Sequence, residues 1–170
     1  MKLILETERF ILREINDQDL PDILSMNSDP EVLKYLHEIP LKDLAHAKAI
    51  VEQHIYPQYE QGLGRWAVVE KSTGLFTGWC GLKFRPELKE TDLGYRFLKS
   101  SWGKGTGQET AKAVLDYGFN TLKLKTITGR AHVDNLASQK ILEKIGMHFM
   151  CEETVDEIPV KTYLAFNPVS

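Results

Sequence analysis

Two kinds of hydrophobic pattern run along the chain, and they predict different elements. Alternating or short apolar runs bounded by turn residues predict strands, whereas apolar residues three or four positions apart predict helices. The strand pattern covers residues 9–15, 65–71, 76–84, 91–99, 126–133, 148–155 and 160–166. The helical pattern covers residues 16–27, 41–55, 108–122 and 135–146.

The order of these elements indicates the fold class. It is strand, two helices, three strands, helix, strand, helix and two strands, and we expect the last two strands to be antiparallel. This mixture indicates a mixed sheet in an α+β (mixed α/β) layer architecture. A length of 170 residues, without repeats or a linker-like stretch, predicts a single domain over residues 1–170.

Composition and charge argue against several classes of protein. The apolar content of 42% and charged content of 26% are ordinary for a globular protein, and the net charge of −3 argues against a nucleic-acid partner. Cys80 and Cys151 form no CxxC pair, so we expect no metal site, and two free thiols favour the cytoplasm. The apolar run within residues 1–10 is too short for a signal peptide or a membrane span, so we expect no membrane association.

One stretch of the chain, SSWGKGTGQETAKAVLDYGF (residues 100–119), carries candidate chemistry. It places Gly103, Gly105 and Gly107 directly before a helical pattern. The start of a helix has unsatisfied N–H groups and a partial positive charge, and glycines let the backbone wrap closely around a phosphate. The spacing matches neither the GxxxxGK[ST] of a Walker A loop nor the GxGxxG of a dinucleotide-binding fold. A flexible turn without a ligand is the alternative explanation.

This stretch and two others resemble the GNAT acetyltransferase family, and in particular its Rim-type branch of ribosomal-protein N-acetyltransferases. The family's motif A, [RQ]-x-x-G-x-[GA], corresponds to residues 102–107, with Trp102 in place of Arg or Gln, as in the WGKG variant of this branch. HVDNLASQKILEKIGMHFM (residues 132–150) resembles the branch signature N-x-x-S-x-x-x-L-E-K-x-G-[FM], and ETERFILREINDQDL (residues 6–20) resembles its opening T-x-R-[LF]-x-L-R. The three matches occur in order and together cover nearly the whole chain.

The resemblance implies the GNAT acyl-CoA N-acyltransferase fold, a mixed, largely antiparallel sheet of six to seven strands flanked by about four helices. It also implies acetyl-CoA as cosubstrate, no metal, and a primary amine as acceptor. Main-chain groups of Phe97 and Leu98 would pair with the pantetheine arm where strands 91–99 and 126–133 splay apart. The residues implied to hold the CoA pyrophosphate are those of the glycine stretch: Trp102, Gly103, Lys104, Gly105, Thr106, Gly107 and Gln108.

Asn135 and Ser138 each have a structural and a functional interpretation. Asn135 stands at a helix N-cap position, and in the family this asparagine also hydrogen-bonds the pantetheine. Ser138 shares a helical face with Ile141 and Leu142, so its hydroxyl needs a partner, which within the helix would be the carbonyl of Asp134. The resemblance makes Ser138 the candidate proton donor to the departing CoA thiolate, because Leu142 occupies the position of the family's usual tyrosine.

The general base that would deprotonate the amine is open. Some Rim-type relatives carry a glutamate five residues before the motif asparagine, where this chain has Arg130. Asp92, His132 and Glu70 are the candidates on predicted strands, and the unperturbed pKa of a histidine suits a base near neutrality. The alternatives are a histidine at a sheet edge without any role and a water relay from a more distant carboxylate.

The acceptor is either a protein N-terminal α-amine or a small-molecule amine such as a polyamine, an amino acid or an aminoglycoside. We expect residues 26–64 to cover the acceptor side, and Trp66, Trp79 and Tyr95 to belong to the core. Two other functions stay open: a module that binds acyl-CoA without turnover, and a regulator that binds a different nucleotide through the glycine stretch. Monomer and homodimer are both compatible with the sequence.

Overall fold

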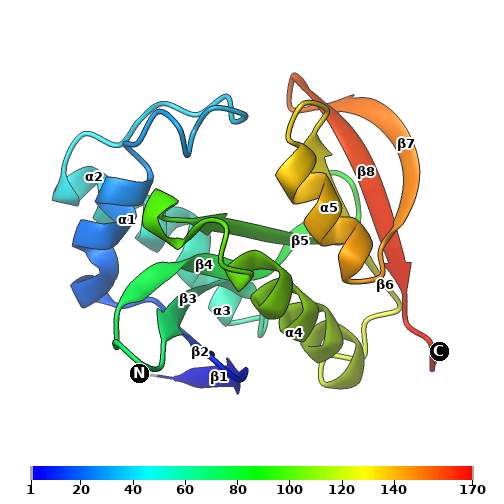
Figure 1. Cartoon of the computed structure of the whole chain (residues 1–170), viewed down its shortest axis with the longest axis horizontal. Coiled ribbons are helices and arrows are strands. Elements are labelled where there is room, and N and C mark those ends of the chain that lie inside the picture. Colours follow the sequence, from blue (N-terminus) through cyan, green and yellow to red (C-terminus); the bar gives the residue numbers. More distant parts are fainter. Residues whose placement is uncertain (1, 170) are drawn as a thin grey trace.

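The computed structural model describes residues 2–169 and contains an eight-stranded sheet (Figure 1). The strand order is β1-β2-β3-β4-β5-β6-β8-β7, and all neighbours are antiparallel except β5 and β6, which are parallel. The strands are β1 (Leu3–Glu6), β2 (Phe10–Arg13), β3 (Gly64–Glu70), β4 (Phe76–Arg85), β5 (Glu90–Phe97), β6 (Thr126–His132), β7 (His148–Val155) and β8 (Ile158–Phe166). This is the mixed, largely antiparallel sheet that the sequence predicts.

The helices lie on both faces of this sheet (Figure 1). They are α1 (Leu20–Met26), α2 (Leu44–Ile50), the π-helical turn η2 (Val51–Ile55), α3 (Tyr56–Tyr59), α4 (Thr106–Asn120) and α5 (Leu136–Lys144), with 3-10 turns η1 (Asp17–Asp19) and η3 (Lys99–Ser101). Between residues 2 and 169 no helix is both long enough and apolar enough to cross a bilayer.

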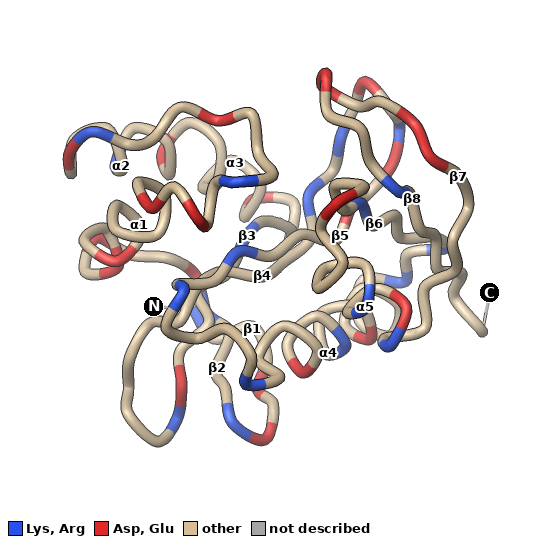
Figure 2. Tube along the Cα trace, turned by 45° about the horizontal axis from the view of Figure 1, so that its top comes forward, with Lys and Arg blue, Asp and Glu red and all other residues tan. Residues whose placement is uncertain are grey.

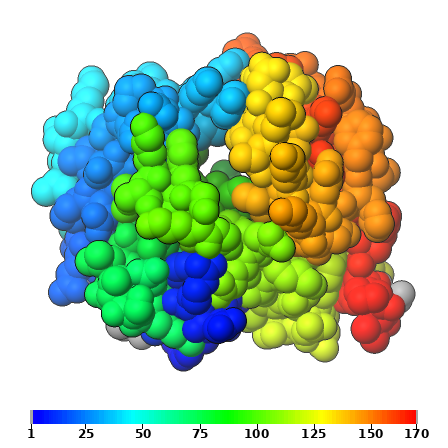
Figure 3. All heavy atoms as spheres, viewed as in Figure 1, coloured from blue at the N-terminus to red at the C-terminus, as the bar shows by residue number. Residues whose placement is uncertain are grey.

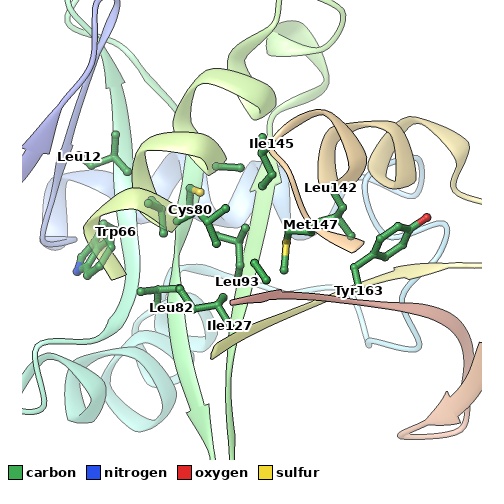
Figure 4. Packing of buried hydrophobic residues seen from close by; sticks show 14 of the residues in the cluster. Leu12, Trp66, Cys80, Leu82, Leu93, Ile127, Leu142, Ile145, Met147 and Tyr163 are labelled. Atoms are coloured by element: carbon green, nitrogen blue, oxygen red, sulfur yellow. The ribbon is translucent and has the colours of Figure 1, made fainter. Parts of the chain in front are cut away.

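Two hydrophobic cores hold the helices to the sheet. The larger lies under α4 and α5 and includes Trp66, Leu82 and Leu142, which are all almost fully buried (Figure 4). The smaller lies under α1, α2 and η2 and includes Ala67 and Trp79. Consecutive residues of β3 therefore serve opposite cores, because side chains alternate across a strand, and this explains the unbroken apolar run in that strand.

The feature that positions a site is the separation of β5 from β6. Asp92 pairs with Thr128 and Leu93 with Gly129, and the described residues form no further pairs between these two strands. β5 continues to pair with β4 through Phe97, and β6 continues to pair with β8 through His132. The sheet therefore opens into a wedge, here called the β5–β6 opening, and the predicted splay of these two segments is confirmed.

The structure differs from the sequence expectations in two elements. The sheet has eight strands rather than six to seven, because Leu3–Glu6 forms an edge strand in which Leu5 pairs with Leu12. The helix expected over residues 41–55 begins at Leu44 and runs on to Tyr59, with the π-helical turn in its middle. The apolar run in Leu3–Glu6 has only three residues, too few to show a strand period, so only its pairing with β2 decides that it is a strand.

Candidate active site

The glycine stretch forms a loop that leads directly into α4. Gly103 (φ +72°) and Gly105 (φ +76°) both have left-handed backbone conformations, and Gly105 is the N-cap residue of α4. An added Cβ at Gly103 would meet none of the described atoms within 4 Å, and one at Gly105 would lie 3.4 Å from Nη2 of Arg9. Backbone conformation, rather than crowding, therefore requires glycine at these two positions.

The third glycine, Gly107, is required by helix packing and not by backbone conformation. Gly107 lies in the first turn of α4, and an added Cβ would lie 2.8 Å from Cδ1 of Ile141, so it lets α5 pack closely against α4. The amides of Thr106, Gly107 and Gln108 have no acceptor within the helix, because they belong to its first turn and no earlier turn of α4 offers carbonyl groups. They lie at the positive end of a 15-residue helix, an arrangement suited to a phosphate group.

Thr7 and Arg9 of the N-terminal segment bind the glycine loop and the first turn of α4, and these contacts are here called the clamp. Glu109 Oε1 accepts hydrogen bonds from Thr7 Oγ1 (2.7 Å) and from the Arg9 amide (2.9 Å), while its Oε2 accepts from Arg9 Nε (2.7 Å). Arg9 Nη1 also donates to the carbonyl of Lys104 at 2.9 Å. Burial raises the pKa of Glu109, but the bonds from Thr7 and Arg9 outweigh it, so this pKa lies below its usual value. The T-x-R segment noted in the sequence is thus joined to the loop.

The remaining residues of the loop have defined but different environments. Trp102 is 45% exposed, yet its Nε1 donates to the carbonyl of Phe97 at 3.1 Å and ties the loop to the end of β5. Thr106 is buried, and its carbonyl accepts a hydrogen bond from Thr110 Oγ1 at 2.8 Å. The side chains of Lys104 and Gln108 are exposed and free to reach a ligand outside the loop.

The direction of the main chain in β5 corrects one sequence expectation. The amide of Leu98 donates to the carbonyl of Thr77 beside β4 at 2.9 Å, so Leu98 faces away from the opening. Main-chain groups alternate sides along a strand, so those of Arg96 also face β4, whereas those of Phe97 and Tyr95 face the opening. The expectation that Leu98 offers its main chain to the opening is wrong, and Tyr95 takes its place beside Phe97.

Asn135 and Ser138 form the start of α5 next to the opening. Asn135 Oδ1 accepts from the Ser138 amide at 3.2 Å, which confirms the N-cap interpretation. Ser138 Oγ lies 2.8 Å from the hydroxyl of Tyr95 on β5, rather than bonding back to the carbonyl of Asp134. The sequence predicts Tyr95 only as a core residue, and nothing in it shows that a residue 43 positions away would be its partner.

His132 forms part of the wall on the β6 side. Its Nδ1 accepts from the amide of Asp134 at 3.0 Å, and its ring packs on that of Tyr35, with 5.2 Å between centroids. When Nδ1 accepts, a neutral imidazole carries its proton on Nε2, which is then a donor and not a base. These contacts favour a structural role for His132.

Two carboxylates proposed as bases are placed differently. Asp92 lies at the apex of the opening, where its Oδ1 accepts from Arg65 Nη2 at 3.0 Å. Arg65 fits beneath β5 because Gly94 has no Cβ, which would lie 2.3 Å from Nη2. Glu70 ends β3, which β4 and β5 separate from the opening, and it accepts a bond from Thr73. Glu70, a candidate base in the sequence, therefore lies away from the β5–β6 opening, although it lines a small pocket with Lys104 and Thr106.

The charged residues around the opening form pairs. Arg130 pairs with Glu90, which lies before the paired part of β5, and Arg96 holds Glu38 through two bonds of 2.9 Å. Arg96 also lies over the ring of Trp79, with 5.3 Å between its Cζ and the centroid. Figure 2 shows basic and acidic residues interspersed along the chain here, so the site has no single dominant sign of charge.

The segment between α1 and α2 reaches across to the other half of the molecule. Tyr35 brings it against His132 on β6, and Glu38 fixes it to Arg96 on β5. Figure 3 shows a hollow at this place, bounded by this light-blue segment, the green end of β5 with the glycine loop, and the yellow-to-orange α5. The expected acceptor-side segment, residues 26–64, thus contributes one wall of the hollow.

No group of three or more potential metal-ligating side chains occurs among residues 2–169. The main-chain amides and neutral hydroxyls at the opening are hydrogen-bond donors that suit an anionic or thioester ligand.

Comparison with known proteins defines the class. A family model described as an acetyltransferase (GNAT) domain matches residues 9–148. The chain is 34% identical over 151 residues to the uncharacterized protein YkkB of Bacillus subtilis, covering 87% of each chain. It is 30% identical over 143 residues to the uncharacterized N-acetyltransferase p20 of Bacillus licheniformis, covering 84% of this chain and 80% of that protein. The chain therefore belongs to the GNAT acetyltransferase family.

Solved structures show the same fold. RimL, a ribosomal L7/L12 alpha-N-protein acetyltransferase in complex with coenzyme A, superposes with a TM-score of 0.84 at 14% identity, covering 99% of this chain and 100% of that one. Spermidine N-acetyltransferase from Vibrio cholerae, in complex with CoA and spermine, has a TM-score of 0.79 at 19% identity, covering 94% and 96%. At these identities the similarity concerns the fold.

Proposed function

We propose that this protein is an acetyl-CoA-dependent N-acetyltransferase that forms a ternary complex and transfers acetyl directly to an amine. The family and its relatives named N-acetyltransferases support acyltransferase activity. The observation that carries the finer proposal is the conjunction of the glycine loop with the β5–β6 opening, because a helix start suited to a phosphate lies beside an unpaired strand edge. We infer that the whole chain forms one domain, and its two free thiols fit the cytoplasm.

The proposed binding mode uses residues on both sides of the opening. Amides of the first turn of α4, with the side chain of Lys104, would hold the pyrophosphate. Main-chain groups of Tyr95 and Phe97 would bind the pantetheine arm as an added strand. Asn135 uses Oδ1 as a cap, so a bond to the arm would come from its Nδ2.

The proposed chemistry needs no covalent intermediate on the protein. The acceptor amine attacks the thioester carbonyl, and an amide of β5 beside the opening, that of Tyr95 two residues before Phe97 in our proposal, stabilises the developing negative charge on oxygen. Asp92 and its partner Arg65 lie at the apex of the opening, where a water between the amine and Asp92 would carry the proton away. Ser138 faces the departing sulfur.

The acceptor is proposed as a primary amine, either a protein N-terminus or a small molecule. Because the arginines near the opening are paired with acids, the site itself selects for neither a strongly anionic nor a strongly cationic acceptor. A single screen therefore has to include both kinds: N-terminal peptides together with polyamines, amino acids and aminoglycosides.

The test combines calorimetric titration with acetyl-CoA and a thiol-release assay over this amine panel. We expect micromolar binding and release of CoA with at least one amine. Binding without release across the whole panel would favour a module that binds acyl-CoA without turnover. Failure of the folded protein to bind acetyl-CoA would refute the proposal.

A further inference from the structure

A pair of hydroxyl groups joins β5 to α5 beside the inner part of the β5–β6 opening. Tyr95 comes from β5, two residues after the last residue paired with β6, and Ser138 comes from the first turn of α5. The Tyr95 hydroxyl lies 2.8 Å from Ser138 Oγ and 3.2 Å from the Ser138 carbonyl oxygen. Its ring is stacked beside that of Phe97, with centroids 6.0 Å apart, so the hydroxyl is held in place.

The two hydroxyls carry two protons, which limits their arrangements. In one arrangement Tyr95 donates to the carbonyl of Ser138, and the Ser138 hydroxyl donates to Tyr95. In the other, Tyr95 donates to Ser138 Oγ, and the Ser138 proton is free to point at a third atom. The first satisfies both groups without a ligand, and the second supplies one directed donor when an acceptor atom enters the opening.

We propose that Tyr95 is a positioning residue that turns the Ser138 hydroxyl toward the CoA sulfur. The inference rests on the proposed function, since it needs acetyl-CoA in the opening. When the amine attacks, the C–N bond forms, the C–S bond breaks, and its electron pair goes to sulfur. Ser138 donates a hydrogen bond to that thiolate without giving up its proton, and the thiolate takes a proton from water after release.

The surroundings of Tyr95 favour this role over proton donation. Burial raises the pKa of Tyr95, although the bond to Ser138 opposes this, so the tyrosine stays neutral and keeps its proton. A serine hydroxyl is also a much weaker acid than a thiol, whose pKa is about 8.5, so net proton transfer to the thiolate is unfavourable. A fixed hydrogen bond is the contribution that these two groups are able to make.

The position at which the family usually carries a tyrosine does not supply this hydroxyl in the present chain. Leu142 occupies it, is 1% exposed, and packs against Gly129, where an added Cβ would lie 3.0 Å from Leu142 Cδ2. The side chain at that position therefore belongs to the core and carries no hydroxyl. Tyr95 supplies a phenol hydroxyl to this end of α5 from the neighbouring strand instead.

The test measures the pKa of the CoA thiol in the complex by thiolate absorbance in the ultraviolet, with CoA-free protein subtracted. We expect the wild-type complex to lower this pKa by about one unit relative to free CoA, because a hydrogen bond to an ion is worth roughly a tenfold change in ionisation. Ser138→Ala should abolish the shift, and Tyr95→Phe should abolish most of it. Ser138→Thr, which keeps a hydroxyl, should retain part of it.

Matched controls separate positioning from folding. Tyr59→Phe removes another partly buried phenol hydroxyl, which donates to the Arg65 carbonyl at 2.7 Å and accepts from the Ile15 amide at 3.1 Å, away from the opening. It should lower the melting temperature and leave the thiol pKa unchanged. Tyr95→Phe should lower kcat roughly tenfold with acetyl-CoA affinity unchanged, and the double variant with Ser138→Ala should be no slower than Ser138→Ala alone.

The outcomes distinguish this inference from the proposed function. A wild-type thiol pKa equal to that of free CoA, or equal values in wild type and Ser138→Ala, overturns the inference even if Tyr95→Phe fails to fold. The inference is also overturned if the reductions in kcat of the two single variants multiply in the double variant. A folded wild type that does not bind CoA refutes the proposed function and this inference with it, whereas CoA binding without a shift refutes this inference alone.

Discussion

Replacement of Gly105 tests whether the loop before α4 binds a pyrophosphate. Its φ of +76° strains any residue with a Cβ, and asparagine and aspartate tolerate this region best among non-glycine residues. Gly105→Asn and Gly105→Asp therefore share the same shape and nearly the same backbone strain. They differ by one negative charge placed beside the first turn of the helix.

The size of the charge effect follows from Coulomb's law. A carboxylate about 5 Å from one phosphate charge is repelled by about 1 kcal/mol in a water-like medium and about 3 kcal/mol at an effective dielectric constant of about 20. Arg9 Nη2 lies 3.4 Å from the position that a Cβ at Gly105 would occupy, so it would pair with the new carboxylate and reduce the repulsion. We therefore expect acetyl-CoA to bind Gly105→Asp roughly tenfold more weakly than Gly105→Asn.

The assay is calorimetric titration of acetyl-CoA into wild type and both variants at low and high salt, with melting temperatures to confirm folding. The difference between the two variants should shrink in about 1 M salt, where the screening length falls to about 3 Å. Equal affinities of folded Gly105→Asp and Gly105→Asn at low salt would refute the placement of the pyrophosphate at this helix start.

Three further predictions test neighbouring parts of the site. Arg9→Ala should raise the Kd for acetyl-CoA by roughly threefold to tenfold in calorimetry, because the loop loses a bond to the Lys104 carbonyl; an unchanged Kd would contradict the clamp. Glu109→Gln should lower the melting temperature at pH 7, and because the folded-state pKa is depressed, the difference should disappear as the pH falls through it; a difference that persists in acid would contradict this. His132→Asn keeps an acceptor for the amide of Asp134, so kcat should change less than roughly threefold. Loss of a general base would instead lower kcat roughly 10²–10⁴-fold.

The fold was largely predictable because its elements have strong periodicity. The stripe of apolar residues after Gln108 predicts α4, and the alternation in residues 126–133 predicts β6, where Ile127 and Ala131 are buried as expected. Strand β1 was missed because a four-residue segment at a sheet edge has no periodicity of its own. The π-helical turn in the helix after Asp43 was missed because it is a departure from regular hydrogen bonding that the apolar spacing does not encode.

The candidate site was predictable only in part. The glycine spacing and the cap at Asn135 are local signals, and both led to the correct elements. The direction of the Leu98 amide was not predictable, because it depends on which strand pairs with β5 on each side. The partner of Ser138 was not predictable either, because Tyr95 reaches it across a gap between elements that are distant in the chain.

By itself, the sequence determined the helices and most strands, the conformational need for glycine at positions 103 and 105, and the family. These depend on spacing and backbone freedom, which are properties of short segments. The tertiary structure decided that Arg9 clamps Glu109 from 100 residues away and that β5 and β6 part after Leu93. Such contacts arise only when strands and helices pack, because side chains that no local pattern links are then brought within hydrogen-bonding distance.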